Sequence, residues 1–376
     1  SSDLDGGSDF GRISLQEMST RLCGSADLFA TEPGRGAPAS INFVSCHDGF
    51  TLTDLTRYRS KHNEANGENN NDGSSVNHSA NFGVEGVTDD PDVIAAREQA
   101  AMNMIGMLLL SLGTPMMLAG DEFRNTQDGN NNAYCQDNDI TWLKWDWMYS
   151  TNKTREMRRL ETVSRLVALR KSLDLYHHED FFTRLTQLGL LKPSSRVQWF
   201  LPDGTTPMER DWFDLGVRSF TMRLLSNSEV DVCIVVNGTA DDRTFRLPPD
   251  THWTPKWCSA EINGRRAGHG TQVEECDLNG DTTVWTQHVP DASETVLKMV
   301  EEVAMQRTES STENEADTIK FAMPVTDHAA NGTSSAPRDE VSADMPDAPV
   351  DDTPDTPVDD NVWTMPALSI TLMKQV

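Results

Sequence analysis

The residues in this sequence most suited to chemistry are a neighbouring imidazole and carboxylate, His47 and Asp48. They come just after a short apolar run, Ile41 to Val44, and Gly49 follows them at once. A short apolar run bounded by glycine is typical of a buried strand in a parallel sheet, and such sheets carry their reactive groups at the carboxyl ends of the strands. The pair could therefore act on a ligand, or it could make only a local hydrogen bond that ends the strand.

A second group of candidates lies in residues 119–138, where Asp121 and Glu122 precede a cluster of asparagines. The acidic pair could act directly, but we expect it to shape the loop through a salt bridge. Carboxylate and amide oxygens are also the ligands that calcium prefers. However, the segment 128–139, DGNNNAYCQDND, lacks the spacing of an EF-hand loop. We therefore expect no metal and no cofactor.

A third loop, residues 139–149, carries three tryptophans, Trp142, Trp145 and Trp147. Aromatic faces can stack on sugar rings, but tryptophans at this spacing more often serve packing, and we expect at least two of the three to do so. Loops rich in amides and aromatic rings suit a neutral, hydroxyl-rich ligand, because such a ligand needs hydrogen-bond donors, acceptors and flat apolar surfaces together.

The charge of the chain argues against two classes of partner. The formal net charge at pH 7 is -27, and residues 301–360 hold 16 Asp and Glu against 3 Lys and Arg. A protein needs Lys and Arg to neutralise the phosphates of nucleic acids or the headgroups of anionic membranes. We therefore expect no nucleic-acid partner and no membrane partner, whereas a neutral substrate would not be repelled.

The cysteines and the first residues bear on the cellular setting. The six cysteines show no CxxC pair and no dense framework, which is typical of buried free thiols in a reducing compartment. The sequence starts at Ser1 with neither an initiator methionine nor a hydrophobic signal core, so we expect it to come from inside a longer protein. The most apolar stretch, 100–119, is interrupted by Gly, Pro and Asn, so we expect no membrane span.

The elements that must position these loops alternate between strand and helix. Residues 88–113 are predicted to form a helix capped by Asp89 or Asp90, and a second short apolar run follows and ends at residues 120–122. Strand, helix and strand in this order make a βαβ unit of a parallel sheet. Residues 154–173 have apolar side chains at helical spacing, which predicts another amphipathic helix.

The pattern changes after Ser194, where apolar and polar residues alternate between turn signals and predict an antiparallel β-domain. Residues 299–360 are rich in Glu, Asp, Ser, Thr and Pro, so we expect them to be disordered. The chain then resumes a strand-like alternation at 361–376 and is predicted to form one last, half-buried strand. In that strand Leu368, Ile370 and Leu372 would face one side, and Ser369 and Thr371 the other.

Several stretches together resemble the glycogen-debranching and isoamylase-type members of the α-amylase superfamily. The resemblance is close over residues 20–175 and looser over 195–295 and 362–374, and the acidic segment matches nothing in the family. It rests on RLCGSADLF (21–29), INFVSCHDGFTLTDL (41–55), KHNEANGENNNDG (61–73) and LLLSLGTPMMLAGDEFRNTQDGNNNAYCQDNDITWLKW (108–145).

The resemblance implies a retaining glycosidase that hydrolyses α-1,6 branch links in glycogen or starch-type glucans. Such enzymes are (β/α)8 barrels with a nucleophilic Asp after strand four, an acid/base Glu after strand five and a third Asp after strand seven. SCHDGF matches the strand-seven motif, so Asp48 would be the third carboxylate, stabilising the transition state, and His47 would bind the sugar. The other substrate-binding residues would be His62, Asn63, Tyr134 and Trp142.

The fold class expected is therefore α/β plus all-β. Residues 1–180 would form the C-terminal portion of the barrel, about strands seven and eight. Residues 181–298 would form a β-sandwich, 299–360 a disordered acidic insertion, and 361–376 the last strand of the sandwich. We expect an intracellular protein, in the cytoplasm or the plastid stroma, acting on glycogen or amylopectin.

One departure from the family concerns the other two carboxylates. The motifs that carry the nucleophile and the acid/base Glu belong upstream of the strand-seven element, and the residues before His47 contain no convincing counterpart. The chain is therefore expected to be a C-terminal fragment that is inactive alone. The alternative is a non-catalytic glucan-binding or regulatory subunit derived from a debranching enzyme.

Overall fold

The computed structural model describes residues 13–29, 35–177, 197–225, 231–249, 252–269, 274–275, 361–366 and 369–375. The segment predicted to be disordered, 299–360, lies outside these ranges, and so does the expected boundary near residue 180. Both stay predictions.

The two long helices form where the sequence offers a cap. Helix α4, Pro91–Leu110, begins after Asp90, whose carboxylate accepts hydrogen bonds from the backbone amides two and three residues further on, at 2.9 and 3.3 Å. Helix α5, Arg155–Lys171, begins after Thr154, which caps it through its hydroxyl at 3.2 Å. Such caps satisfy amides that a helix leaves unpaired. Both predicted helices are confirmed.

The other helical elements are short. They are α1 Leu15–Leu22, α2 Ala26–Phe29, α3 Leu52–Leu55 and α7 Glu209–Phe213, with the 3₁₀ helices η1 Ala37–Ala39, η2 Glu64–Asn66, η3 Asp121–Phe123, η4 Asp146–Tyr149, η5 Asp174–His177 and η6 Ser259–Asn263.

Two short parallel strands flank α4. Strand β1, Ile41–Asn42, pairs with β2, Thr114–Pro115, and together with α4 they form the predicted βαβ unit. The expectation of a buried strand over residues 41–44 is wrong, because β1 is two residues long and the side chains of Ile41 and Phe43 are 60% and 54% exposed. Among the described residues β1 is bonded to β2 alone, which leaves its other edge uncovered.

The chain after residue 196 forms antiparallel sheets, as its alternation predicts. The strands are β3 Val197–Phe200, β4 Ser219–Leu224, β5 Val232–Asn237, β6 Arg243–Arg246, β7 Trp253–Cys258, β8 Arg265–Arg266, β9 Gly268–His269, β10 Glu274–Glu275, β11 Val362–Met365 and β12 Ser369–Gln375. A five-stranded sheet has the order β3-β4-β5-β12-β7, and a three-stranded sheet has the order β6-β11-β9. Strands β8 and β10 pair separately.

The end of the chain differs from the single half-buried strand that was expected. It forms two strands in two different sheets, β11 in the three-stranded sheet and β12 between β5 and β7. On β12, Thr371 and Met373 are as buried as Leu372, so both faces of the strand are covered. Leu368, expected on one face, lies outside the described residues.

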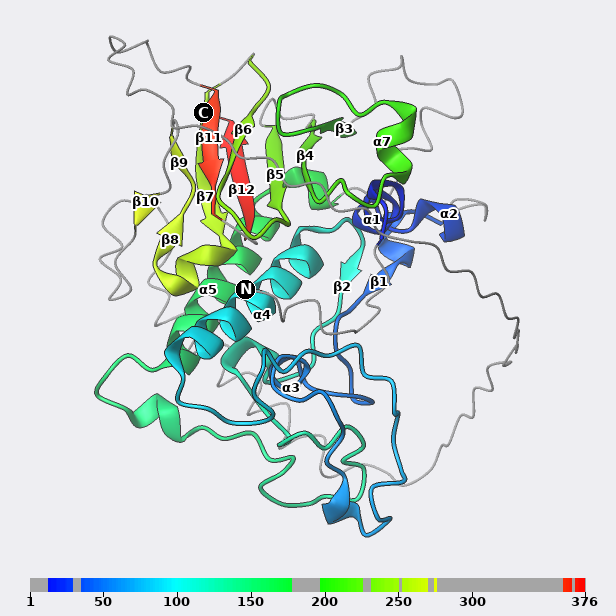
Figure 1. The fold of residues 1–376 in the computed structure, drawn as a ribbon, viewed down its shortest axis with the longest axis vertical. Coiled ribbons are helices and arrows are strands. Elements are labelled where there is room, and N and C mark those ends of the chain that lie inside the picture. The colour runs from blue at the N-terminus through cyan, green and yellow to red at the C-terminus, as the bar shows by residue number, and fades with distance from the viewer. Residues whose placement is uncertain are drawn as a thin grey trace, which may run out of the picture. The chain divides into compact units, whose positions relative to one another are not determined.

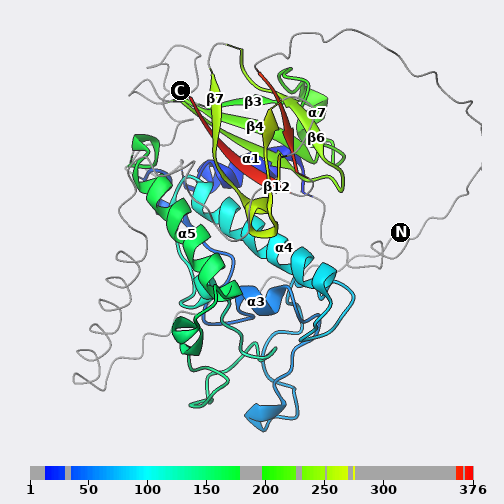
Figure 2. The same cartoon turned by 90° about the vertical axis from the view of Figure 1, so that its left-hand side faces the viewer.

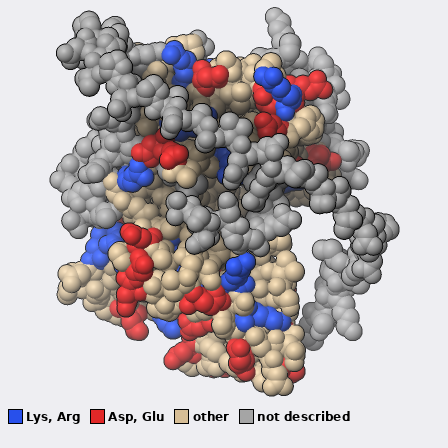
Figure 3. All heavy atoms as spheres, viewed as in Figure 1, with Lys and Arg blue, Asp and Glu red and all other residues tan. Residues whose placement is uncertain are grey.

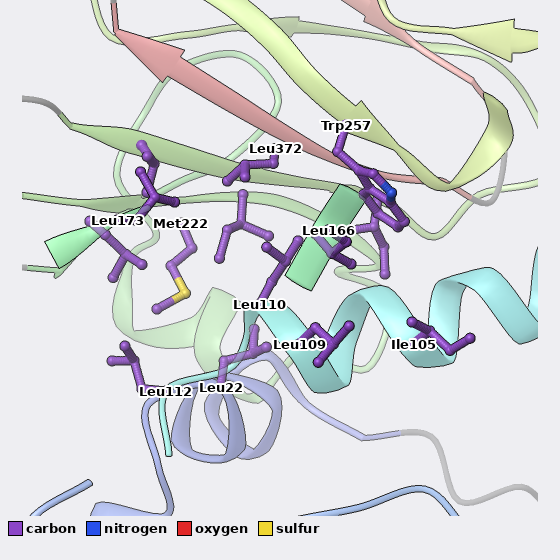
Figure 4. Packing of buried hydrophobic residues seen from close by; sticks show 14 of the residues in the cluster. Leu22, Ile105, Leu109, Leu110, Leu112, Leu166, Leu173, Met222, Trp257 and Leu372 are labelled. Atoms are coloured by element: carbon purple, nitrogen blue, oxygen red, sulfur yellow. The ribbon is translucent and has the colours of Figure 1, made fainter. Parts of the chain in front are cut away.

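The main apolar core joins the helices to the five-stranded sheet. In Figures 1 and 2, α4 and α5 lie on one side of that sheet, and Figure 4 shows Ile105 and Leu109 of α4 facing Leu166 of α5 and Leu372 of β12. Packing is close enough that a Cβ atom at Gly106 would lie 2.9 Å from the ring of Trp257. Helix α4 can approach β7 because Gly106 has no side chain.

A second, smaller core covers the opposite face of β12. It gathers Val235 and Met373 from the five-stranded sheet with Phe245 and Met365 from the three-stranded sheet. This layer explains the full burial of β12, since the apolar core covers one face of the strand and the second sheet covers the other.

Helix α4 also has the composition of a membrane span. Among the described residues it is the one helix long and apolar enough to cross a membrane, and half of that apolar stretch is buried inside the protein. Its buried side chains belong to the main core.

We expect the Leu372→Ala variant to lower the free energy of unfolding by about 2–5 kcal/mol, because it removes a side chain that is 1% exposed and leaves a cavity between sheet and helices. The control is Lys374→Ala on the same strand, where the side chain is partly exposed and the change should stay within about 0.5 kcal/mol. Urea denaturation of the purified chain measures both, and equal losses would contradict the central position of β12.

Candidate functional site

The imidazole and carboxylate predicted to act on the substrate are both turned to solvent. The side chains of His47 and Asp48 are 88% and 82% exposed, and His47 Nε2 lies 3.6 Å from Asp48 Oδ2. This distance is too long for a good hydrogen bond, so the pair does not simply close on itself. Both groups are available to a ligand.

The loop that carries this pair, residues 45–52, is fastened at both ends to one carboxylate. The hydroxyl of Ser45 donates to Asp121 Oδ2, and the backbone amide of Leu52 donates to Asp121 Oδ1 at 2.9 Å. Asp121 was expected to shape its own loop, 119–138, through a salt bridge, whereas in the structure it accepts hydrogen bonds that fasten the loop of His47 and Asp48. Glu122 acts locally, accepting from the amide of Gly120 at 2.8 Å.

Burial controls the ionisation of Asp121. Its side chain belongs to a residue only 2% exposed, and burial raises its pKa from the ordinary value of 3.8 to about 6, although the hydrogen bonds from Ser45 and Leu52 oppose the shift. The nearby guanidinium of Arg159 also opposes it, and Glu122 adds to it.

Beneath the loop lies a buried ion cluster of Glu98, Arg124 and Arg159. Glu98 of α4 accepts from Arg159 of α5 at 2.8 Å and lies 3.2 Å from Arg124. Arg159 also donates to the hydroxyl of Thr53 at 3.3 Å and to the backbone carbonyl of Asp121 at 3.4 Å. Burial would raise the pKa of Glu98, but the two guanidinium groups hold it below its ordinary value.

Two long loops beside the His47–Asp48 pair are held together by amide side chains. Asn63 Nδ2 donates to Asn131 Oδ1 at 2.9 Å, and the backbone amide of Asn131 donates back to Asn63 Oδ1 at 3.0 Å. Gly73 fits against this pair with φ at +72°, where a Cβ atom would lie 2.3 Å from Asn131 Oδ1. Only glycine suits that position.

This network changes the role of Asn63. The residue is fully buried, and both atoms of its amide are engaged with the protein. Direct substrate contact, expected from the resemblance, does not fit this environment, because such a side chain has nothing left to offer a sugar. In the structure Asn63 instead holds residues 61–77 against residues 127–132.

Backbone hydrogen bonds bring the same loops to the His47–Asp48 pair. The amide of Gly49 donates to the carbonyl of Asn131 at 3.0 Å, and that of His62 donates to the carbonyl of Gly129 at 2.8 Å. The half-exposed ring of His62 lies 3.2 Å from Glu85 Oε1. In Figures 1 and 2 these loops and α3 lie on the side of α4 away from the five-stranded sheet.

The aromatic residues divide into packing and exposed groups. Trp145 and Trp147 pack on Phe123, with ring centroids 4.7 and 5.4 Å away, which confirms packing for two of the three tryptophans. Tyr134 and Trp142 are 71% and 55% exposed, and the indole of Trp142 donates to Asp137 at 3.0 Å. Within the described ranges, no hydrogen bond or ring contact joins either residue to His47 or Asp48.

The described part of the chain offers no metal centre, since no three His, Cys, Asp or Glu side chains there are grouped to hold an ion. On the face shown in Figure 3, acidic and basic side chains of the described residues are interspersed. The residues that sequence reasoning missed are Ser45, Glu98, Arg124 and Arg159. Of the residues that hold the His47–Asp48 loop, Asp121 alone was recognised as a candidate in the sequence, because it ends an apolar run.

Comparison with named proteins finds relatives whose names concern glycogen. Over 212 residues, 55% of this chain and 28% of the other, the sequence is 44% identical to the glycogen operon protein GlgX homolog of Mycobacterium tuberculosis. Over 270 residues, 71% of this chain and 38% of the other, it is 37% identical to the glycogen debranching enzyme of Pectobacterium atrosepticum. No family model matches the chain.

The chain is thus homologous to the curated proteins named GlgX homolog and glycogen debranching enzyme, and the resemblance read from its motifs is confirmed. It spans 28% to 38% of the length of these two relatives. Solved structures that align with it include the catalytic module of the glycogen-degrading pneumococcal virulence factor SpuA, at 12% identity and a TM-score of 0.46 over 97% of this chain and 39% of that one. A pullulanase from Anoxybacillus sp. LM18-11 complexed with maltotetraose aligns at 17% identity and a TM-score of 0.42, over 72% of this chain and 31% of that one.

We expect the Arg159→Met variant to lower the free energy of unfolding by about 3 kcal/mol, because it leaves Glu98 buried with one cationic partner in place of two. The control is Arg158→Met, since Arg158 is the preceding residue on the helix, is partly exposed and, among the described residues, donates to a backbone carbonyl alone. Chemical denaturation compares the two. A loss no larger than that of the control would contradict the role of the cluster.

Replacing Asp121 by asparagine should remove one component of the pH dependence of stability. Because the pKa of Asp121 is raised in the folded protein to about 6, the folded state binds a proton there more tightly than the unfolded chain does. The resulting stabilisation is complete below pH about 4 and is lost as the pH rises through about 6. We therefore expect wild type to lose stability relative to Asp121→Asn across this window. Urea denaturation at several pH values measures the difference, and a difference independent of pH would contradict the assignment.

Proposed function

We propose that this chain is the C-terminal part of a retaining glycoside hydrolase that cleaves α-1,6 branch linkages in glycogen or starch-type glucans. The observation that carries the proposal is the exposed His47–Asp48 pair, held on a pinned loop after β1 in a chain homologous to glycogen debranching enzymes. The βαβ unit would then belong to the last part of a (β/α)8 barrel. The two antiparallel sheets would form the β-sandwich that follows it.

Asp48 would act as the third carboxylate of the reaction. Cleavage passes through an oxocarbenium-like transition state, and an ionised carboxylate beside it stabilises the developing positive charge. His47 would donate a hydrogen bond to a hydroxyl of the same sugar ring. Both side chains are free to do so, since they are exposed, and a bound glucan would exclude the water that now surrounds them and strengthen both interactions.

The surrounding surface suits a glucan as substrate. Tyr134 and Trp142 expose aromatic faces on which sugar rings can stack. His62 offers a ring nitrogen beside Glu85. The amide-bonded loops present neutral donors and acceptors, which match the hydroxyl groups of a polysaccharide without charge repulsion. We therefore keep His62, Tyr134 and Trp142 as proposed substrate contacts.

The nucleophilic Asp and the acid/base Glu would come from sequence that precedes Ser1 in the complete protein. The alternative is a non-catalytic glucan-binding or regulatory subunit derived from a debranching enzyme. The two proposals differ in one observable. A complete protein that binds glycogen but releases no linear chains from it would establish the subunit.

In the complete protein, the Asp48→Asn variant should lower kcat on a branched glucan about a thousandfold or more, because the lost charge acts mainly on the transition state. KM should change much less. The control is Asp128→Asn, which removes an equal charge from an exposed position in the neighbouring loop and should leave kcat unchanged. Steady-state kinetics with reducing-end detection measures both, and near-normal turnover by Asp48→Asn would refute the proposal.

A further inference from the structure

A single carboxylate bridges the two ends of the segment that presents His47 and Asp48. Asp121 Oδ2 accepts from the hydroxyl of Ser45, and Oδ1 accepts from the amide of Leu52 at 2.9 Å. All three residues are buried, whereas the two side chains between them are exposed. The two oxygens of a carboxylate are rigidly spaced, so they fix the separation of the two loop ends.

Asp121 is itself held in place from below. It lies in η3 between Gly120 and Arg124, whose φ angles of +99° and +70° are both in the left-handed region. A Cβ atom at Gly120 would lie 2.5 Å from the side chain of Asn125, so the turn requires glycine there. From α5, Arg159 donates to the backbone carbonyl of Asp121 at 3.4 Å. The carboxylate is therefore anchored to the helices through the buried ion cluster.

The other described contacts of the loop lie between its two ends or at its Leu52 end, where Phe50 is 3% exposed and its ring centroid lies 6.3 Å from that of Tyr58. The amide of Gly49 donates to the carbonyl of Asn131 at 3.0 Å, and the thiol of Cys46 donates to the carbonyl of Asp48 within the loop at 3.2 Å. Neither contact fixes where the loop begins and ends. Without Asp121, the Ser45 end would lose its side-chain hydrogen bond and its fixed distance from Leu52, and the exposed side chains that follow it would be free to shift.

We propose that Asp121 is a positioning residue for the His47–Asp48 pair, setting the place of Asp48 through Ser45 and Leu52 without touching the substrate. The inference rests on the proposed function, because it assigns Asp48 a part in the reaction. In this role Asp121 fixes the position of Asp48 through the two hydrogen bonds that it accepts. Its negative charge is not needed for that. A misplacement of a reacting group by about 1 Å costs on the order of a hundredfold in rate.

Asp54 provides a matched comparison for a purely structural role. It is an equally buried carboxylate of α3, and it accepts from the hydroxyl of Thr126 and from the amide of Gln127 at 2.8 Å. These two hydrogen bonds fasten residues 126–127. Asp54 also contacts Thr51, next to the Leu52 end of the loop, but no hydrogen bond among the described residues joins it to Ser45. Loss of Asp54 should therefore weaken the fold while leaving the Ser45 end of the loop, and with it Asp48, much less disturbed than loss of Asp121 does.

The first experiment measures kinetics in the complete protein. We expect Asp121→Ala to lower kcat about a hundredfold with a much smaller change in KM. We expect Asp121→Asn to restore kcat to within about tenfold of wild type, because an amide oxygen can accept from Leu52 while the amide NH₂ donates to Ser45. Asp54→Asn should retain kcat. An Asp121→Asn variant as slow as Asp121→Ala, or an Asp121→Ala variant as fast as wild type, would overturn the proposal.

The second experiment follows the loop in the 376-residue chain without an activity assay. Cys46 lies beside His47 and reports on the loop through its rate of reaction with a thiol reagent, in a background where Cys135 and Cys276 are serine. We expect Asp121→Ala to raise this rate and to speed hydrogen exchange at the Leu52 amide, and Asp54→Ala to leave the Cys46 rate nearly unchanged. Unchanged rates in folded Asp121→Ala would overturn the positioning role.

The two experiments separate this inference from the proposed function. If Asp48→Asn abolishes turnover while Asp121→Ala retains it, the positioning role fails and the proposed function stands. If Asp48→Asn retains turnover, the proposed function fails, and with it the catalytic meaning of the positioning. The thiol and exchange rates still decide, in that case, whether Asp121 orders the loop.

Discussion

The pairing of one buried carboxylate with two guanidinium groups is the constraint on which the site depends. Glu98 belongs to α4, Arg159 to α5 and Arg124 to the turn after η3, so no two members of the cluster share an element. A buried charge left without its partner costs several kcal/mol. Moving one of these elements away from the others would leave such a charge, so the cluster holds the three elements together. Arg159 also reaches Thr53 in α3 and the backbone of Asp121. The same group of charges therefore holds both α3, which follows the His47–Asp48 loop, and η3, whose Asp121 fastens that loop.

The loops around the pair are ordered by a different means, with amides in place of charges. Residues 61–77 and 127–138 contain little regular structure, and loops of this length normally need a reason to stay ordered. Here asparagine side chains keep the loops ordered, because one amide can both donate and accept a hydrogen bond. Asn63 and Asn131 exchange hydrogen bonds across the two loops. A framework of amide hydrogen bonds orders the two loops without adding charge of its own. That property agrees with an uncharged ligand, and it uses the same residue type that a sugar would recognise.

How far the sequence could predict the structure differs between elements. Helix α4 could be predicted from its cap and α5 from apolar side chains at helical spacing, because both signals lie in residues that are close together in the sequence. Burial was harder: alternation on β12 predicted one solvated face, but small polar residues such as Thr371 also fit beneath a second sheet, and that sheet is formed by distant strands. Asn63 shows the same limit, since residue type cannot tell an amide that faces a ligand from one that faces another loop. The position of the His47–Asp48 pair could be predicted, but the groups that hold it could not, because they come from positions that are neighbours only in the fold.

The arrangement around Asp121 separates stability from placement. Burying this carboxylate raises its pKa to about 6, which means that its ionised form is held in the folded protein at some cost in stability near neutral pH. A leucine at the position would avoid that cost, but its side chain could accept no hydrogen bond from Ser45 or Leu52. Destabilising groups that persist in a fold are concentrated where geometry matters more than stability. The exposed pair supplies the chemistry proposed here, and a buried acid that the fold tolerates at a cost supplies the position from which that chemistry would act.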